Sequence, residues 1–165
     1  MATIQLPPDF KEFLRLLNSN SVQYLVIGGY AVNYYGFARA TADLDIWIAI
    51  SPVNAGCVAA VLGEFGFPQA TAADFLEERR VIRMGVPPVR LEVLTSISGV
   101  DFETCFARRL EAELDGVKVH LIHLEDLKRN KQARTNSSFG SLTQTMALKI
   151  VAQRTPSETR RGTGV

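Results

Sequence analysis

The chain has 165 residues, of which 47% are hydrophobic and 21% are charged, and its formal net charge is +1. These values are typical of one soluble globular domain. The apolar runs are far shorter than the roughly 20 residues that a membrane span needs, and two cysteines are too few for a disulfide framework. We therefore expect a cytoplasmic protein with reduced thiols and no membrane association; the N-terminus has no apolar segment of the signal-peptide kind.

Helical and extended segments alternate along the chain. Phe10, Phe13, Leu14 and Leu17 have the spacing of one helix face, and Asp115-Gly116 between two alternating runs predicts a β-hairpin. We expect helices over 7–20, from 30 to near Gly36, over Val58–Phe65 with Gly66 as its end, over 102–110 and over 124–133. We expect strands over 22–29 and 43–50, within 81–95 on both sides of a turn, and within 111–122. This alternation predicts an α/β (α+β) fold with a mixed sheet flanked by helices.

The composition changes after Arg134. Residues 1–127 hold 10 Lys and Arg against 16 Asp and Glu, whereas residues 128–165 hold 8 against 1. Ser, Thr and Gly also become frequent in this second part. We therefore divide the chain into a domain over 1–133 and a basic C-terminal arm over 134–165, partly helical and disordered over its last ten or so residues. A basic arm is able to hold polyanions while the acidic body has another role.

Two carboxylates stand at the start of the apolar run 43–50. Asp43 and Asp45 flank Leu44, so on a strand they point to the same face, with Cβ atoms roughly 6.5–7 Å apart. A divalent cation such as Mg²⁺ takes hard oxygen ligands and relieves the repulsion between like charges. Glu92, inside the apolar run 89–94, is the candidate for a third ligand.

Each of these acids has a structural alternative. An Asp-x-Asp pair at a strand edge is often solvated, and Glu92 either faces water or pairs with Arg90 or Arg83 instead of a metal. Gly28 and Gly29 are ambiguous in the same way, because glycines commonly end strands. The combination is more specific: a strand, two glycines, a short helix and an acidic strand place backbone N–H groups and a metal beside the same phosphates.

The run "IGGYAVNYYGFARATADLDIWI" resembles the DNA polymerase beta-like nucleotidyltransferase superfamily. It looks like a bacterial branch that includes minimal nucleotidyltransferases and the nucleotidyltransferase toxins of abortive-infection systems. The branch carries an Arg-x-Thr-x-Asp-h-Asp pattern, where h is apolar, and here it stands as Arg39, Thr41, Asp43 and Asp45. The resemblance covers about residues 8–133 and implies a palm-like sheet.

This resemblance implies a Mg²⁺-dependent transferase. It moves a nucleoside monophosphate from a nucleoside triphosphate, such as ATP, to an acceptor hydroxyl and releases pyrophosphate. The resemblance implies two Mg²⁺ ions, replaceable by Mn²⁺, on Asp43, Asp45 and Glu92. The acceptor is an RNA 3′ end, a protein or a small molecule, and a cognate toxin or antitoxin is a further expected partner. The alternative is a catalytically inactive relative that acts as a binding or antitoxin protein through its partner.

Further residues are expected to contact the nucleotide. Gly28 and Gly29 approach the phosphates. Arg39 clamps the phosphates with several donors, or else is a surface arginine paired with Asp43 or Asp45. Thr41 supports the metal loop, or else is a threonine that only starts the strand. Lys131 reaches the triphosphate, or else is a solvated helix lysine.

Two features depart from the family. The third acid is commonly Asp, whereas here Glu92 is one methylene longer. The usual Gly-Arg and Lys-Asp helix does not follow the region of Lys131.

Overall fold

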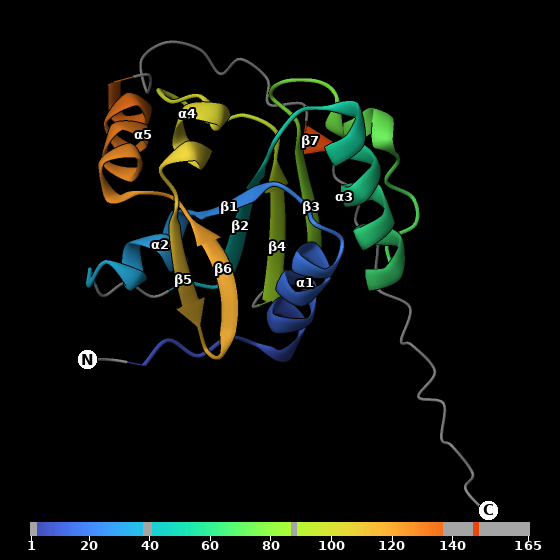
Figure 1. Cartoon of the computed structure of the whole chain (residues 1–165), viewed down its shortest axis with the longest axis horizontal. Helices are drawn as coiled ribbons and strands as arrows, with labels where there is room; N and C mark the ends of the chain where they lie inside the picture. The colour runs from blue at the N-terminus through green and yellow to red at the C-terminus, as the bar shows by residue number, and fades with distance from the viewer. Residues whose placement is uncertain (1–2, 38–40, 87–88, 137–146, 149–165) are drawn as a thin grey trace, which may run out of the picture.

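The computed structural model describes residues 3–37, 41–86, 89–136 and 147–148 (Figure 1). Its helices are α1 (Pro8–Ser19), α2 (Gly28–Tyr34), α3 (Pro52–Phe65), the short 3₁₀ helix η1 (Ala72–Phe75), α4 (Phe102–Ala107) and α5 (Leu124–Asn136). Its strands are β1 (Tyr24–Ile27), β2 (Asp43–Ile48), β3 (Val81–Val86), β4 (Val89–Leu94), β5 (Leu110–Leu114), β6 (Val117–Leu121) and β7 (Ala147–Leu148). None of these helices is long and apolar enough to cross a membrane.

The described strands form one mixed sheet in the order β5-β6-β1-β2-β4-β3-β7. Two central strand pairings determine where the acids lie: β1 pairs antiparallel with β2, and β2 pairs parallel with β4. Strand β4 in turn pairs antiparallel with β3. The predicted class, a mixed sheet flanked by helices, is confirmed.

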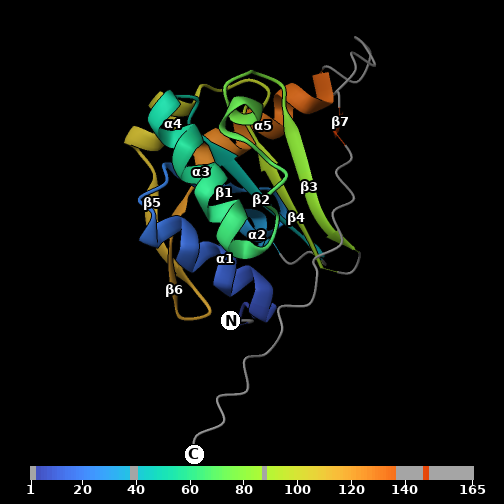
Figure 2. The ribbon, with the colours of Figure 1, turned by 90° about the vertical axis from the view of Figure 1, so that its right-hand side faces the viewer.

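The sheet separates an apolar face from a polar one. Along β2, Leu44 and Ile46 are fully buried, whereas Asp43 and Asp45 alternate with them and are only partly buried. Helices α1 and α3 pack against each other, with the Phe13 and Phe65 rings 5.2 Å apart, and Figure 2 shows them in front of the sheet with α5 behind it. The α1/α3 side of the sheet is therefore covered by apolar packing, and the acids face the other side, where Trp47 is also buried against Phe102.

Most predicted elements are found, with two corrections at helix ends. The helix expected from residue 30 to near Gly36 spans Gly28–Tyr34, so it begins two residues earlier and both glycines lie in its first turn. The helix expected over 102–110 ends at Ala107, because Leu110 pairs with Leu121 at the start of the predicted hairpin. That hairpin turns at Asp115 and Gly116, both with positive φ, as an Asp-Gly turn requires.

Candidate active site

Three carboxylates meet on the polar face of the sheet. In the parallel pairing of β2 with β4, Asp45 stands directly opposite Glu92, and Asp43 stands opposite Arg90. Side chains two residues apart on a strand share a face, so Asp43, Asp45 and Glu92 lie on the same side. The structure therefore brings together the three acids that the sequence selects, although Glu92 follows Asp45 only after another helix and strand.

Of these acids, Asp45 has the least favourable environment for a negative charge. Its Oδ1 atom is buried and finds no hydrogen-bond partner among the described residues. Burial, and then the neighbouring charge and hydrogen bonding of Glu92, raise the pKa of Asp45 to about 7; Asp43 adds to this effect and Arg134 opposes it. A proton or a bound cation relieves the charge of such a carboxylate, and the buried Oδ1 atom without a described partner favours a ligand at this position.

The raised pKa of Asp45 predicts an unusual pH dependence of stability. Its pKa is about 7 in the folded chain and about 3.9 when unfolded, so between these values the folded state binds more protons. Stability from this group therefore falls as the pH rises from about 4 to about 7 and is constant above that range. In EDTA, the thermal midpoint of Asp45→Asn minus that of the wild type should grow by a few degrees from pH 5 to pH 8. Differential scanning calorimetry measures it, and a constant difference would contradict the shift.

The two glycines place the start of α2 against the acids. A β-carbon at Gly28, which has φ +67°, would collide with the carboxylate of Asp45, and one at Gly29 would collide with the side chain of Thr41. The Thr41 hydroxyl donates to the backbone carbonyl of Asp43 at 3.2 Å, which holds the segment that leads into β2. In this structure the glycines therefore make room for the chain's own Asp45 and Thr41.

Glu92 already has a cationic partner. Nε of Arg83, on the neighbouring strand β3, donates to Oε1 of Glu92 at 2.9 Å, so one structural alternative considered from the sequence is found. The Glu92 side chain is 16% exposed and that of Arg83 is 41% exposed. Among the described residues, no three His, Cys, Asp or Glu side chains are grouped closely enough to hold a metal ion as they stand.

A large cleft of about 1440 Å³ lies over this face. It is lined by Gly28, Gly29, Thr41, Asp43, Asp45, Glu92 and Lys131 among others, so every predicted site residue that the structure describes borders the same space. Arg39 lies outside the described residues.

The cleft also has four basic residues that the sequence reasoning did not assign to the site: Arg79, Arg83, Arg90 and Arg134. Arg134 stands three residues after Lys131 on α5, a spacing that puts both on neighbouring positions of one helix face. This three-residue spacing from Lys131 was the feature of the sequence from which Arg134 could have been predicted as a site residue.

Helix α5 is fastened over the cleft by buried polar contacts. Asp126, whose side chain is 1% exposed, accepts from Nε of Arg108 at 2.8 Å, which links α5 to the end of α4. One turn later, Asn130 donates to the carbonyl of Ser98 at 3.0 Å. Gly99, with positive φ, lets the same loop approach α5 where a β-carbon would collide with Ala133. These contacts fix the position of the basic side chains on the next face of the helix.

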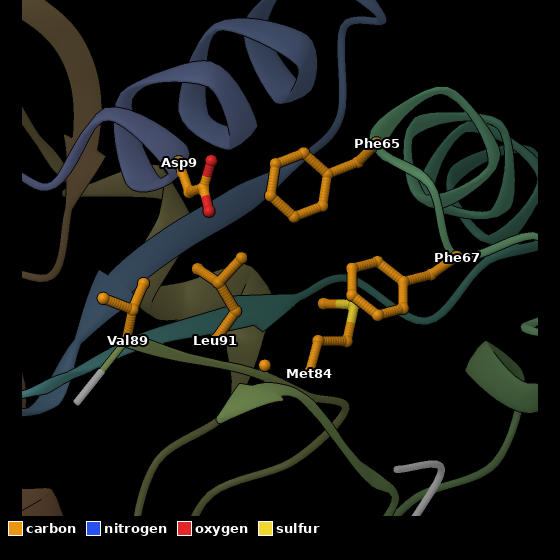
Figure 3. Close-up of a pocket in the computed structure, with 7 residues that line it drawn as sticks. Asp9, Phe65, Phe67, Met84, Val89 and Leu91 are labelled. Carbon is orange, nitrogen blue, oxygen red and sulfur yellow. The ribbon is translucent and has the colours of Figure 1, made fainter. Parts of the chain in front are cut away.

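A second pocket on the apolar side of the sheet does not compete with this cleft. Figure 3 shows its lining side chains, among them Phe65, Phe67, Met84 and Leu91, with Asp9 beside them. Its volume is about 50 Å³, room for a few waters at most. It is a packing gap where β3 and β4 meet α1 and the end of α3, and it is too small for a nucleotide.

The donors on the acid row fit a hard divalent cation. All three are carboxylates, which Mg²⁺ and Mn²⁺ prefer, and the buried Asp45 oxygen lacks any other described partner. The Arg83–Glu92 ion pair is the one contact that a cation at Glu92 would have to share or replace. Among the described residues, Asp43, Asp45 and Glu92 are therefore the candidate ligands for such an ion, although their side chains are not yet grouped around one point.

Comparisons with known proteins agree with this geometry. A family model described as "Nucleotidyl transferase of unknown function (DUF2204)" matches residues 8–153, which extends beyond residue 133, where we placed the end of the resemblance. A candidate nucleotidyltransferase from Thermotoga maritima, known from its crystal structure, is similar in fold. Its TM-score is 0.53 at 14% identity, over 81% of this chain and 87% of that one. No curated protein matches the chain.

Proposed function

The chain belongs to the family described as nucleotidyl transferases of unknown function (DUF2204), and we propose that it transfers a nucleoside monophosphate from a nucleoside triphosphate to an acceptor hydroxyl, releasing pyrophosphate. The observation that carries the proposal is the acid row on β2 and β4, where Asp45 keeps a buried oxygen without a described hydrogen-bond partner inside the large cleft. Family membership supports the enzyme class; the metal, the nucleotide and the acceptor are our proposal.

The acids are assigned as the metal ligands of the reaction. Asp43 and Asp45 would hold Mg²⁺ for the triphosphate, and Glu92 would help to hold a second ion. When bound, Mg²⁺ neutralises charge on the phosphates and lowers the pKa of the attacking hydroxyl. The chain's own part is to fix the carboxylates on two adjacent strands, so that they are in place before the substrates arrive.

The basic side chains around the acids are assigned to the phosphates. Lys131 and Arg134 border the cleft from α5, and Arg90 borders it from the position opposite Asp43. Their positive charges attract the triphosphate and stabilise the departing pyrophosphate. The proposal also includes the phosphate contacts that the sequence predicts for Arg39, Gly28 and Gly29. Thr41 is assigned to support the segment that leads into β2.

The cleft leaves room for an acceptor beside the nucleotide. It extends from the acids along the loop after β4 to α4, past Ser96, Ile97 and Phe102. We assign this end to the acceptor, which is an RNA 3′ end, a protein hydroxyl or a small molecule in the cytoplasm. A regulatory toxin or antitoxin partner also belongs to this proposal, as for the nucleotidyltransferase toxins that the sequence resembles.

Transfer of α-phosphate label tests the proposal directly. Purified protein with Mg²⁺ and each of the four labelled nucleoside triphosphates is incubated with total RNA or cell protein, and the products are separated by size and class. We expect label on one acceptor class, lost when EDTA removes the metal. Nucleotide binding without any transfer would favour the inactive, partner-dependent alternative, and the absence of both binding and transfer would overturn the proposal.

A further inference from the structure

The ion pair between Arg83 and Glu92 lies inside the cleft rather than at the edge of the molecule. The two residues stand opposite each other in the antiparallel pairing of β3 with β4, and Glu92 in turn stands opposite Asp45 on β2. One row across three strands therefore reads Asp45, Glu92, Arg83, with the guanidinium at one end of two carboxylates.

Arg83 is a cation that the chain itself supplies to this row. Its Nε atom lies 2.9 Å from the Oε1 atom of Glu92, within the distance of a charge-assisted hydrogen bond. Glu92 is mostly buried, so without a cation its charge would add to that of Asp45 in a poorly solvated place. The more exposed Arg83 side chain borders the same cleft, so its guanidinium is able to meet a ligand there.

We propose that Arg83 is the internal counter-cation of Glu92 and exchanges partners when the substrate binds. Without ligand, Arg83 neutralises Glu92 and opposes a divalent cation there. With metal and nucleotide present, Glu92 turns to the metal and Arg83 turns to a phosphate of the nucleotide. This inference rests on the proposed function and adds to it a positioning residue that acts in opposite directions on the two ligands.

The exchange has a signature that a merely structural arginine would not produce. Arg83→Met should bind Mn²⁺ about tenfold more tightly than the wild type, the order that Coulomb's law gives for removing one neighbouring unit charge under strong solvent screening. The same variant should bind the Mg²⁺ complex of a nucleoside triphosphate about tenfold more weakly, since a phosphate contact is lost. Arg83→Lys keeps the charge and should restore an Mn²⁺ affinity near that of the wild type.

Isothermal titration calorimetry on the full chain measures both affinities, first with Mn²⁺ alone and then with each of the four nucleoside triphosphates in Mg²⁺. The matched control is Arg80→Met. Arg80 stands just before β3, three residues before Arg83, pairs with the exposed Glu77, and is not among the residues that line the cleft. Circular dichroism confirms that each variant is folded. We expect Arg80→Met to keep both wild-type affinities.

The outcomes separate this inference from the proposed function. Opposite shifts of the two affinities in Arg83→Met alone support the exchange. If the wild type binds both ligands and Arg83→Met behaves like Arg80→Met, or loses both affinities together, the exchange is overturned while the proposed function stands. If the wild type binds neither Mn²⁺ nor any nucleotide, the proposed function itself fails.

Discussion

Asp45→Asn should lower the rate of nucleotide transfer by at least about 10²–10³-fold, as expected when one ligand of the reacting centre is lost, and at the same time raise the thermal midpoint of the ligand-free protein. Both effects have one cause. The Asp45 carboxylate is buried beside Glu92 and Asp43 without a described hydrogen-bond partner for Oδ1. Its charge is unfavourable for folding and is the property that a bound cation needs.

The neutral amide in Asp45→Asn is expected to change folding stability and metal binding in opposite directions. Asparagine has nearly the same shape, adds no charge to the row, and has an N–H₂ group that is able to donate to Glu92. Stability should therefore rise while metal binding falls, an exchange that is common where a site holds unfavourable groups for function.

Label transfer and calorimetry at pH 8 in EDTA measure the two effects of Asp45→Asn. The matched control is Glu64→Gln, an equally conservative change at an exposed position of α3 on the opposite side of the sheet, which should alter neither. Wild-type activity in Asp45→Asn would remove Asp45 from the reaction. Lost activity with a lowered midpoint would mean that Asp45 stabilises the fold rather than straining it.

Arg108→Met should destabilise the folded protein strongly, by about 5–10 °C in thermal midpoint. The Asp126 side chain is 1% exposed, and Arg108 donates to it from α4. The hydrogen bonds from Arg108 hold the pKa of Asp126 below its ordinary value, so the folded chain contains a buried carboxylate whose main compensation comes from this one side chain. Methionine keeps the apolar stem and removes the charge, which leaves the buried carboxylate inadequately paired.

Three comparisons identify the source of this loss. Arg108→Met with Asp126→Asn should recover most of the midpoint, because no buried charge is then left unpaired. Lys128→Met removes a charge of α5 from the exposed pair with Glu125 and should change the midpoint little. The loss in Arg108→Met should also shrink below about pH 4, since the stabilisation from a depressed carboxylate pKa disappears as that group is protonated. A double variant no better than the single one would contradict the buried-charge account.

The way in which α5 is attached also links the stability of the fold to nucleotide binding. Asp126 and Asn130 hold one side of the helix, and Lys131 and Arg134 border the cleft. We therefore expect surviving Arg108→Met protein to bind nucleotide more weakly than the wild type at a temperature where both are folded.

The local parts of the fold could be read from the sequence because their signals are local. The apolar spacing from Phe10 to Leu17 is sufficient for α1, and Asp115-Gly116 is sufficient for the β5–β6 turn. The pairing of Asp43 with Asp45 on one face follows from the two-residue period of a strand. Each of these predictions depends on residues within one turn of helix or one short strand.

The arrangement between elements could not be read in this way. The position of Glu92 opposite Asp45 depends on the parallel pairing of β2 with β4, and the partner of Glu92 depends on the antiparallel pairing of β4 with β3. From the sequence, Arg83 and Arg90 were equal alternatives for Glu92, and only the register of β3 decides for Arg83. The place of Arg134 in the cleft depends in the same way on how α5 docks on α4 and on the loop before it.

Buried and cleft-facing residues alternate along β4, so the packing of the core fixes the position of Glu92. Leu91 and Val93 are nearly fully buried on the apolar side, so they lock the strand against sliding along β2. A slip of one residue would carry Glu92 into the hydrophobic interior and present Leu91 to the cleft. The buried side chains of β4 thus set the register that places the acids. Replacements on the buried side that preserve volume should leave the acid row in place. Replacements that loosen the strand should lower the activity of the site although none of its own residues is changed.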